Sequence, residues 1–185
     1  MRVGGLVLAA GEGRRFGGTK QLAELRGRPL LEHALLAVAA LSPRVVVLGH
    51  EADAIRAAVD LHGAWPVVCD GWREGQAASL RRGVAALGDV DAALVVLGDM
   101  PDVTPAAVAA VVAAAGGAED AVRGTYDGVA GHPVLLRRAL LDRVGELRGD
   151  VGFRSLLDCA NIVEVELAGV ANPRDIDTRE ELATR

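Results

Sequence analysis

Lysine is almost absent from this chain, which has 19 arginines but a single lysine, Lys20, among its 185 residues. Aromatic residues make up only 3%, so the stacking platforms that bind single-stranded nucleic acids are missing. The 25 acidic residues outnumber the 20 basic ones, and the net charge of −5 excludes the broad basic surface of a nucleic-acid-binding protein. Any anion must therefore be bound locally, and the lone lysine lies in the most glycine-rich loop of the chain.

Cysteines and long apolar runs are scarce as well. Cys69 and Cys159 lie far apart without CxxC spacing, which favours a reducing cytosol over a disulfide framework. Charged residues interrupt the longest apolar stretch, near residues 30–41, so that it falls short of the roughly 18 residues that span a bilayer. The apolar stretch 3–10 runs directly into a charged loop, unlike a signal peptide. We therefore predict a cytoplasmic protein with neither a membrane nor a nucleic acid as partner.

Short apolar runs alternate along the chain with longer alanine-rich amphipathic stretches. This alternation, with 51% hydrophobic residues to bury, predicts an α/β fold: a three-layer α/β/α sandwich around a mostly parallel sheet, in one domain over residues 1–185. Strands are expected at residues 3–10, 44–49, 66–69, 92–98, 120–124, 132–136 and 162–166. Helices are expected at residues 29–41, 52–61, 76–87, 104–115, 137–146, 152–158 and 178–184.

Local signals mark a turn and two helix starts. The Tyr126-Asp127-Gly128 segment has the chemistry of a hairpin turn, so we expect antiparallel strands in the C-terminal third. Thr104 is expected to cap one helix, and the capping-box pattern at residues 178–181 is expected to begin the last.

Residues 8–20 form the most distinctive local feature, a glycine loop at the carboxyl end of the first expected strand. Ligands bind at this edge of open α/β sheets. Glycines let backbone N–H groups approach phosphate oxygens, while arginine and lysine supply the opposite charge. The spacing matches neither a dinucleotide fingerprint, because one residue too many follows Gly13, nor a Walker A loop, because Thr19 precedes Lys20. A nucleoside triphosphate is the expected ligand.

Carboxylates lie next to two other expected elements, a strand and the last helix. Asp99 comes directly after the strand at residues 92–98, where it either binds a magnesium ion that bridges phosphate oxygens or caps the following turn. Asp175 and Asp177 point the same way if their segment is extended. One of them would complete the metal site, and we favour Asp177, whose alternative role is to stabilise the N-terminus of the last helix.

The pattern Leu-Ala-Ala-Gly-x-Gly-x-Arg-x-Gly-x-x-Lys in residues 8–20 resembles the signature loop of nucleotidyltransferases that activate sugars, isoprenoid alcohols and molybdopterin. The chain is most similar to the molybdenum cofactor cytidylyltransferases and their molybdopterin-guanine-like relatives. The resemblance covers nearly the whole chain and implies their Rossmann-like nucleotide-diphospho-sugar transferase fold. It extends through five further segments, at residues 70–80, 97–101, 131–133, 149–154 and 175–178.

The resemblance implies an Mg²⁺-dependent enzyme that transfers NMP from an NTP to a phosphorylated acceptor and releases pyrophosphate. CTP is favoured because guanylyl-transferring relatives typically show Leu-Ala-Gly-Gly in the loop, and GTP stays open. Molybdopterin or molybdenum cofactor is the expected acceptor, with a molybdoenzyme or its maturation factor as a possible partner. The alternatives are a nucleotidyltransferase for a sugar or isoprenoid phosphate and a non-catalytic nucleotide- or cofactor-binding maturation factor.

Individual roles follow for the matching residues. The catalytic residues are expected to be Arg14, on the β- and γ-phosphates, Lys20, near the α-phosphate, and Asp99, which with Asp177 holds the metal. Nucleotide-binding residues are expected to be Leu8, Ala9, Ala10, Gly11, Gly13, Arg14, Lys20, Asp70, Gly75 and Ser79. Acceptor-binding residues are expected to be His132, Asp150 and Arg154. Relatives often carry asparagine at Asp70, and Trp72 is expected either in the core or near the base.

Overall fold

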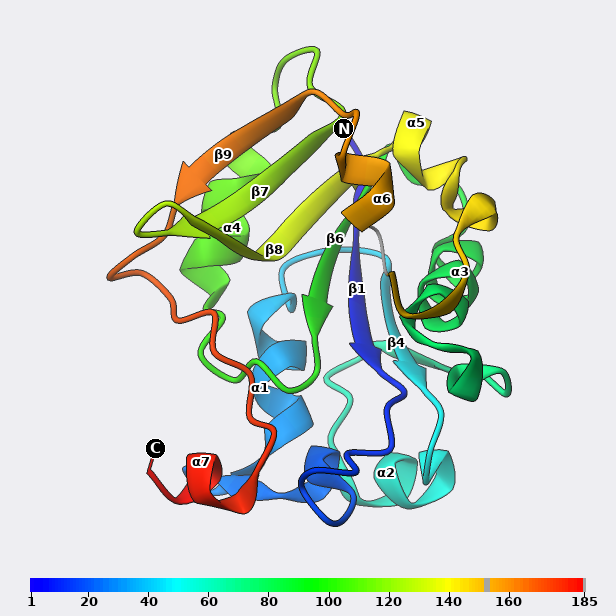
Figure 1. Cartoon of the computed structure of the whole chain (residues 1–185), viewed down its shortest axis with the longest axis vertical. Coiled ribbons are helices and arrows are strands. Elements are labelled where there is room, and N and C mark those ends of the chain that lie inside the picture. Colours follow the sequence, from blue (N-terminus) through cyan, green and yellow to red (C-terminus); the bar gives the residue numbers. More distant parts are fainter. Residues whose placement is uncertain (152–153, 185) are drawn as a thin grey trace.

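A seven-stranded sheet forms the centre of the computed structural model (Figure 1), which describes residues 1–151 and 154–184. Its strands are β1 (Val3–Ala9), β4 (Arg44–Leu48), β5 (Trp65–Val68), β6 (Ala92–Leu97), β7 (Ala121–Tyr126), β8 (Val129–Arg137) and β9 (Ile162–Glu166). They lie in the order β5-β4-β1-β6-β8-β7-β9. All neighbouring pairs are parallel except β6 with β8 and β8 with β7. The predicted mostly parallel sheet is confirmed.

Helices cover both faces of this sheet. The helices of the described chain are α1 (Leu30–Ala37), α2 (Ala52–Ala58), α3 (Gln76–Leu87), α4 (Pro105–Ala113), α5 (Arg138–Leu141), α6 (Arg154–Leu157) and α7 (Arg179–Ala183), of which α7 lies apart from the sheet (Figure 1). Four 3₁₀ turns, η1 to η4, span Lys20–Leu22, Trp72–Glu74, Val144–Glu146 and Gly149–Val151. Helices α1 and α4 lie on one face, and α3, α5 and α6 on the other (Figure 1). This arrangement is the predicted three-layer sandwich. No helix in the described ranges is long and apolar enough to cross a membrane.

The central strands are buried on both faces, as their continuous apolar sequences predict. Every residue of β1 is buried, and alternate side chains enter opposite layers: Val7 packs beneath α1, whereas Leu6 packs beneath α3. Small residues set the spacing of these layers. In α3, a Cβ added at Gly83 would lie 2.8 Å from Cγ2 of Val47 and closer still to the side chain of Leu6.

Replacing Gly83 by alanine is therefore expected to destabilise the protein, although alanine is the better helix former. Overpacking in a closed core costs about 1–3 kcal/mol and alanine regains about 1 kcal/mol of helix propensity. Because the added Cβ at Gly83 would lie closer than 3 Å to two side chains, we expect a cost near the upper end and a net loss of up to about 2 kcal/mol. Urea unfolding measures this loss. The control is Gly116→Ala, whose added Cβ meets no atom within 4 Å. Unchanged stability of Gly83→Ala would contradict this close packing of α3 on β1.

The expected hairpin and helix caps are present. Asp127 and Gly128 both have positive φ between β7 and β8, as a two-residue hairpin turn requires. The Thr104 side chain accepts a hydrogen bond from the N–H of Ala107, and Thr178 forms the capping box with Glu181. These predictions are confirmed.

Several element boundaries differ from the prediction. The helix expected at residues 137–146 is two short pieces, α5 and η3, with the poor helix former Gly145 in the second. The helix expected at 29–41 ends at Ala37, and of the helix expected at 152–158, residues 152 and 153 lie outside the described chain. Strands β2 (Glu24–Leu25) and β3 (Arg28–Pro29) were not predicted, because two-residue strands have no apolar period.

A small second core ties the C-terminal segment to the glycine loop. Buried Phe16, from the loop, and Ile176, which precedes α7, pack together with Leu25 and Leu30. The guanidinium of Arg179, in α7, lies 5.2 Å from the centre of the Phe16 ring. Segments more than 150 residues apart in sequence are thereby held side by side (Figure 1).

Candidate functional site

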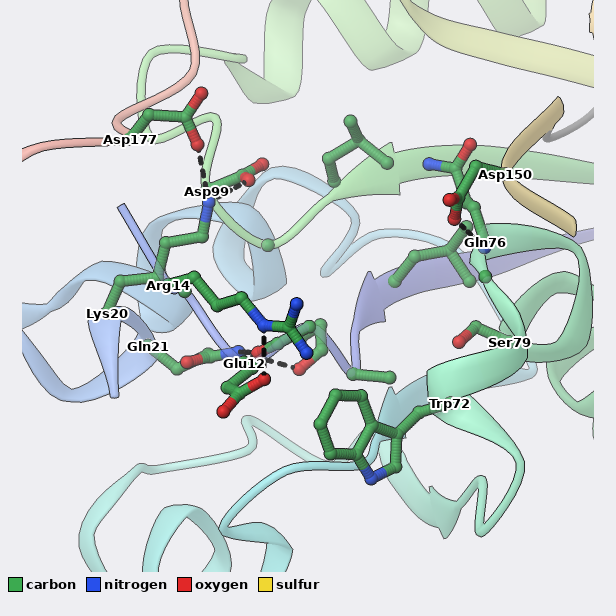
Figure 2. Close-up of a pocket in the computed structure, with 18 of the residues that line it drawn as sticks. Glu12, Arg14, Lys20, Gln21, Trp72, Gln76, Ser79, Asp99, Asp150 and Asp177 are labelled. Atoms are coloured by element: carbon green, nitrogen blue, oxygen red, sulfur yellow. Dashed lines mark hydrogen bonds and ion pairs between the residues drawn. The ribbon is translucent and has the colours of Figure 1, made fainter. Parts of the chain in front are cut away.

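A cavity of about 470 Å³ opens at the carboxyl ends of β1 and β6, beside the N-terminus of α3 (Figure 2). This is the sheet edge at which ligands bind in open α/β folds. Twelve of the residues predicted from sequence line it: Leu8, Ala9, Ala10, Gly11, Gly13, Arg14, Lys20, Gly75, Ser79, Asp99, Asp150 and Asp177. The glycine loop, which follows β1, and the segment with Asp99, which follows β6, meet at this edge. Strands β1 and β6 are adjacent and in register, with Leu8 beside Leu97.

The glycine loop leaves several peptide N–H groups available at the cavity. Gly13 has a φ of +66°, and an added Cβ there would lie 2.9 Å from the carbonyl oxygen of Gly18, so the turn requires glycine. Within the described chain, the N–H groups of Gly11, Glu12 and Gly13 donate to no other residue, although all three residues line the cavity. Successive free N–H groups of this kind attract anionic oxygens.

Lys20 joins the glycine loop to two carboxylates from distant parts of the chain. Its Nζ donates to Oδ2 of Asp99 at 2.6 Å and to Oδ1 of Asp177 at 3.0 Å (Figure 2). The side chain is only 12% exposed. Burial works against the charged form, but the carboxylates of Asp99 and Asp177 outweigh it and raise the pKa of Lys20 above its ordinary value. Lys20 therefore carries its charge in the cavity at any physiological pH.

Asp99 and Asp177 also fit a divalent cation. One oxygen of Asp99, Oδ1, is buried and has no hydrogen-bond partner among the described residues. Asp99, Asp175 and Asp177 each offer an oxygen within 4.8 Å of the others, and carboxylate oxygens are the ligands that Mg²⁺ and Mn²⁺ take. Burial and the charges of Asp177 and Asp99 raise the pKa of Asp175, so the three negative charges repel one another and a cation would relieve that repulsion.

Hydrogen bonds just before and at the start of α7 fix the position of Asp177. The N–H of Ile176, a fully buried residue, donates to the backbone oxygen of Asp99 at 2.9 Å. The Asp177 N–H donates to Oε2 of Glu181 at 2.7 Å, next to the capping box. Asp177 thus precedes the helix start, as its alternative role required, while its side chain faces Lys20.

The two loop arginines behave differently. Arg14, predicted to be catalytic, is 81% exposed and pairs with Glu12, and their hydrogen bond lowers the pKa of Glu12 and raises that of Arg14. Arg15 pairs with Oδ2 of Asp177 at 2.6 Å. When the loop pattern is aligned on Gly11, Gly13 and Gly17, its arginine falls on Arg15. The pattern therefore already pointed to Arg15, which was not among the site residues expected from the sequence.

The opposite wall comes from the segment between β5 and α3. Trp72 lines the cavity with its ring 4.3 Å below the guanidinium carbon of Arg73 and 5.5 Å from the His50 ring. Asp150 accepts a hydrogen bond from the N–H of Gln76, the first residue of α3, at 3.3 Å. Trp72 and Asp150 thus both flank the cavity (Figure 2).

Three predicted site residues are not among those lining the cavity. Asp70 is exposed just after β5, and Arg154 is exposed at the start of α6. Residues 152 and 153, in the same predicted acceptor segment, lie outside the described part of the chain. His132, on β8, lies near enough to Asp99 to feel its charge, and burial lowers the pKa of His132 to about 4.

This low pKa predicts an acid sensitivity. An unfolded histidine has a pKa near 6.5, so the unfolded chain takes up the extra proton before the folded chain does as the pH falls. The contribution of neutral His132 to the free energy of unfolding is therefore fully present only above about pH 6.5. We expect His132 to cost up to about 2 kcal/mol of unfolding free energy between pH 7.5 and 5. Urea unfolding at these two pH values measures the loss. The matched variant His132→Asn should show a smaller loss, and an equal loss in both proteins would contradict the prediction.

Comparisons with known proteins agree with this geometry. The sequence profile of the MobA-like NTP transferase domain matches residues 5–166. The nicotine blue oxidoreductase of Paenarthrobacter nicotinovorans is 31% identical over 97% of this chain and 94% of its own length. The bifunctional protein GlmU of Alkalilimnicola ehrlichii is 37% identical over 118 residues, which are 60% of this chain and 25% of that protein. The chain thus spans about a quarter of the length of that GlmU.

Solved structures extend the likeness to the whole fold. Rv0371c of Mycobacterium tuberculosis H37Rv superimposes with a TM-score of 0.86 at 30% identity, over 100% of this chain and 97% of that one. A manganese complex of Rv0371c superimposes with a TM-score of 0.82 at 28% identity, over 100% and 97% of the two chains. Family profile, full-length relative and fold concur, and this chain belongs to the MobA-like NTP transferase family.

Proposed function

We propose that this protein transfers NMP from a nucleoside triphosphate to a phosphorylated acceptor of the molybdopterin type and releases pyrophosphate. The observation that carries the proposal is the meeting of Lys20 with Asp99 and Asp177 beside the free N–H groups of the glycine loop. Phosphoryl and nucleotidyl transfer depend on alignment and charge neutralisation more than on covalent catalysis. An ionised phosphate acceptor needs no general base.

Each group has a part in this reaction. The N–H groups of the glycine loop bind the triphosphate, and Arg14 and Arg15 neutralise its β- and γ-phosphates. Lys20 leaves its carboxylate partners and approaches the α-phosphate, where negative charge grows during transfer. The segment from Trp72 to Ser79 lies against the nucleoside.

Asp99 and Asp177 are the proposed Mg²⁺ ligands, with Asp175 as an additional oxygen donor. A divalent ion supplies charge neutralisation of the phosphates. Among the similar structures, Rv0371c is described as a manganese complex. Lys20 contacts the same two carboxylates that would hold the ion, so an ion bound there would share Asp99 and Asp177 with Lys20.

CTP is the proposed nucleotide because the loop reads Leu-Ala-Ala-Gly, and GTP is the alternative. The acceptor side is proposed to include Asp150, which lines the cavity, together with His132 and Arg154. His132, Arg154 and, on the nucleotide side, Asp70 would reach the ligand only after a rearrangement, since none of the three lines the cavity. Residues 1–185 are proposed to act as one cytoplasmic NTP transferase domain that passes its product to a molybdoenzyme or maturation factor.

One assay tests the proposal. The protein is incubated with Mg²⁺, each of the four NTPs and, in separate reactions, molybdopterin, a sugar phosphate or an isoprenoid phosphate, and pyrophosphate release is measured. We expect release with CTP and molybdopterin. Turnover only with another acceptor would replace the acceptor assignment. Tight nucleotide binding without turnover on any acceptor would favour a non-catalytic binding protein.

A further inference from the structure

Gln21 is a buried polar residue directly after the lysine of the glycine loop. It is the second residue of the short turn η1 and only 4% exposed. An amide removed from water at such a position is costly unless its polar atoms are hydrogen-bonded. None of the roles proposed above uses this side chain.

The contacts of Gln21 are directed at the backbone of the loop. Its Nε2 donates to the carbonyl oxygens of Ala9 and Gly11, each at 2.9 Å. Because two carbonyl acceptors can be met only by the NH₂ end, the orientation of the amide is fixed. The carbonyl between them, on Ala10, accepts from the N–H of His50 at 3.1 Å. Three successive loop carbonyls are thus held by donors from elsewhere in the chain.

These bonds decide what the loop presents to the cavity. A peptide unit carries its C=O and N–H on opposite sides, so holding a carbonyl against Gln21 turns the following N–H away from Gln21. The N–H of Glu12, which follows the Gly11 carbonyl held by Gln21, donates to no described residue. The N–H of Gly11, which also donates to no described residue, follows the Ala10 carbonyl held by the neighbouring donor, the N–H of His50. Without the tether, a rotated peptide would direct a carbonyl oxygen at the bound anion and repel it.

Stability alone does not account for a glutamine at this position. The other amide atom, Oε1, is buried and meets no donor among the described residues, which costs free energy that an apolar side chain would avoid. Methionine has nearly the same length and shape, and it carries neither the donors nor the unpartnered oxygen. The two bonds to the loop are what glutamine adds.

We propose that Gln21 is a positioning residue for the anion site, which holds the glycine loop with its N–H groups free for the polyphosphate of the nucleotide. This inference rests on the proposed function, since it takes the ligand to be a triphosphate. It predicts that loss of the Nε2 donors weakens binding of any polyphosphate, including inorganic pyrophosphate, which has neither base nor ribose.

The test compares wild type with Gln21→Met in binding of inorganic pyrophosphate and of CTP by titration calorimetry, with Mg²⁺ present. We expect both dissociation constants to rise by about tenfold or more, which is about 1.4 kcal/mol per tenfold. The KM for CTP should rise with them. A merely structural role would lower the amount of folded, active protein, and hence the apparent kcat, while leaving KM and both dissociation constants unchanged.

Two further variants make the test decisive. Gln21→Glu keeps the shape and replaces the NH₂ donor with a carboxylate oxygen. If the methionine variant does not fold, the same rise in both dissociation constants is expected for Gln21→Glu. Thr125→Val is the matched control, because Thr125 is another buried polar residue whose hydroxyl bonds to Glu166 in the distant β7–β9 region. We expect it to change the melting temperature but neither dissociation constant.

The outcomes separate this inference from the proposed function. Wild-type affinity for pyrophosphate in a folded Gln21→Met protein overturns the inference, and so does a wild-type protein that binds no polyphosphate. If pyrophosphate binding depends on Gln21 but no acceptor gives turnover, the transferase proposal fails and the positioning role stands.

Discussion

The Lys20→Arg protein is expected to lose at least about 99% of its kcat, a loss of the size seen when one transition-state donor is removed. The charge is retained, so the effect comes from shape. Nζ of Lys20 lies within 3.0 Å of two carboxylates, and Cγ would lie only 3.3 Å from a Cβ at Gly13. A planar guanidinium is larger than an ammonium and cannot approach a single phosphate oxygen in the same way.

Steady-state pyrophosphate release at saturating CTP and Mg²⁺ measures this effect. The control is another exchange of one basic residue for the other, Arg143→Lys, at an exposed position where the arginine pairs with Glu146 and neither residue lines the cavity. That variant should retain wild-type turnover. If Lys20→Arg kept a third or more of the wild-type kcat, the lysine would act only as a general positive charge.

The Asp99→Asn protein is expected to show a roughly thousandfold lower turnover and weaker binding of divalent ions, since a metal that neutralises phosphate charge contributes several kcal/mol. Asparagine keeps the shape but removes the negative charge that faces Lys20. It also leaves one oxygen and one NH₂ group in place of two carboxylate oxygens, of which Oδ1 has no partner among the described residues. Because Asp177 still pairs with Lys20, the fold should survive the change. Asp99→Ala should abolish metal-dependent turnover with the fold intact.

Binding of Mn²⁺ is followed by electron paramagnetic resonance, and turnover by pyrophosphate release. Asp102→Asn provides a matched control three positions further on, where a carboxylate that does not line the cavity pairs with the exposed Arg26. It should leave both measurements unchanged. Near-normal Mn²⁺ binding and turnover in Asp99→Asn would mean that Asp99 serves the turn after β6 and that the metal is held elsewhere.

Much of the architecture could be predicted from local patterns in the sequence. The continuous apolar runs of β1 and β6, the Asp127-Gly128 turn and the caps at Thr104 and Thr178 depend on neighbouring residues alone, and each is present in the structure. Failures occurred where the signal was too short or not local. Strands β2 and β3 have two residues each, and the helix expected at residues 137–146 is interrupted.

The order of the strands could not be read from the sequence. Strand β8 pairs with both β6 and β7, so it lies between them in the sheet although it follows β7 in the chain. The hairpin turn predicts the β7–β8 pairing, but which of the two strands joins β6 depends on packing against the helices. His132 is placed within reach of the charge of Asp99 by this arrangement.

The lone lysine illustrates the division between sequence and tertiary structure. Its place among the glycines was enough to predict a phosphate-binding loop, because glycine conformations and the charges of nearby side chains are local properties. That Lys20 contacts Asp99 and Asp177, that Arg15 reaches Asp177, and that Gln21 holds two loop carbonyls was decided by the tertiary structure. Strand register brings Asp99 to the loop, and the small core around Ile176 brings Asp177. Such contacts join residues as many as 157 positions apart, and only the packed chain brings them within hydrogen-bonding distance.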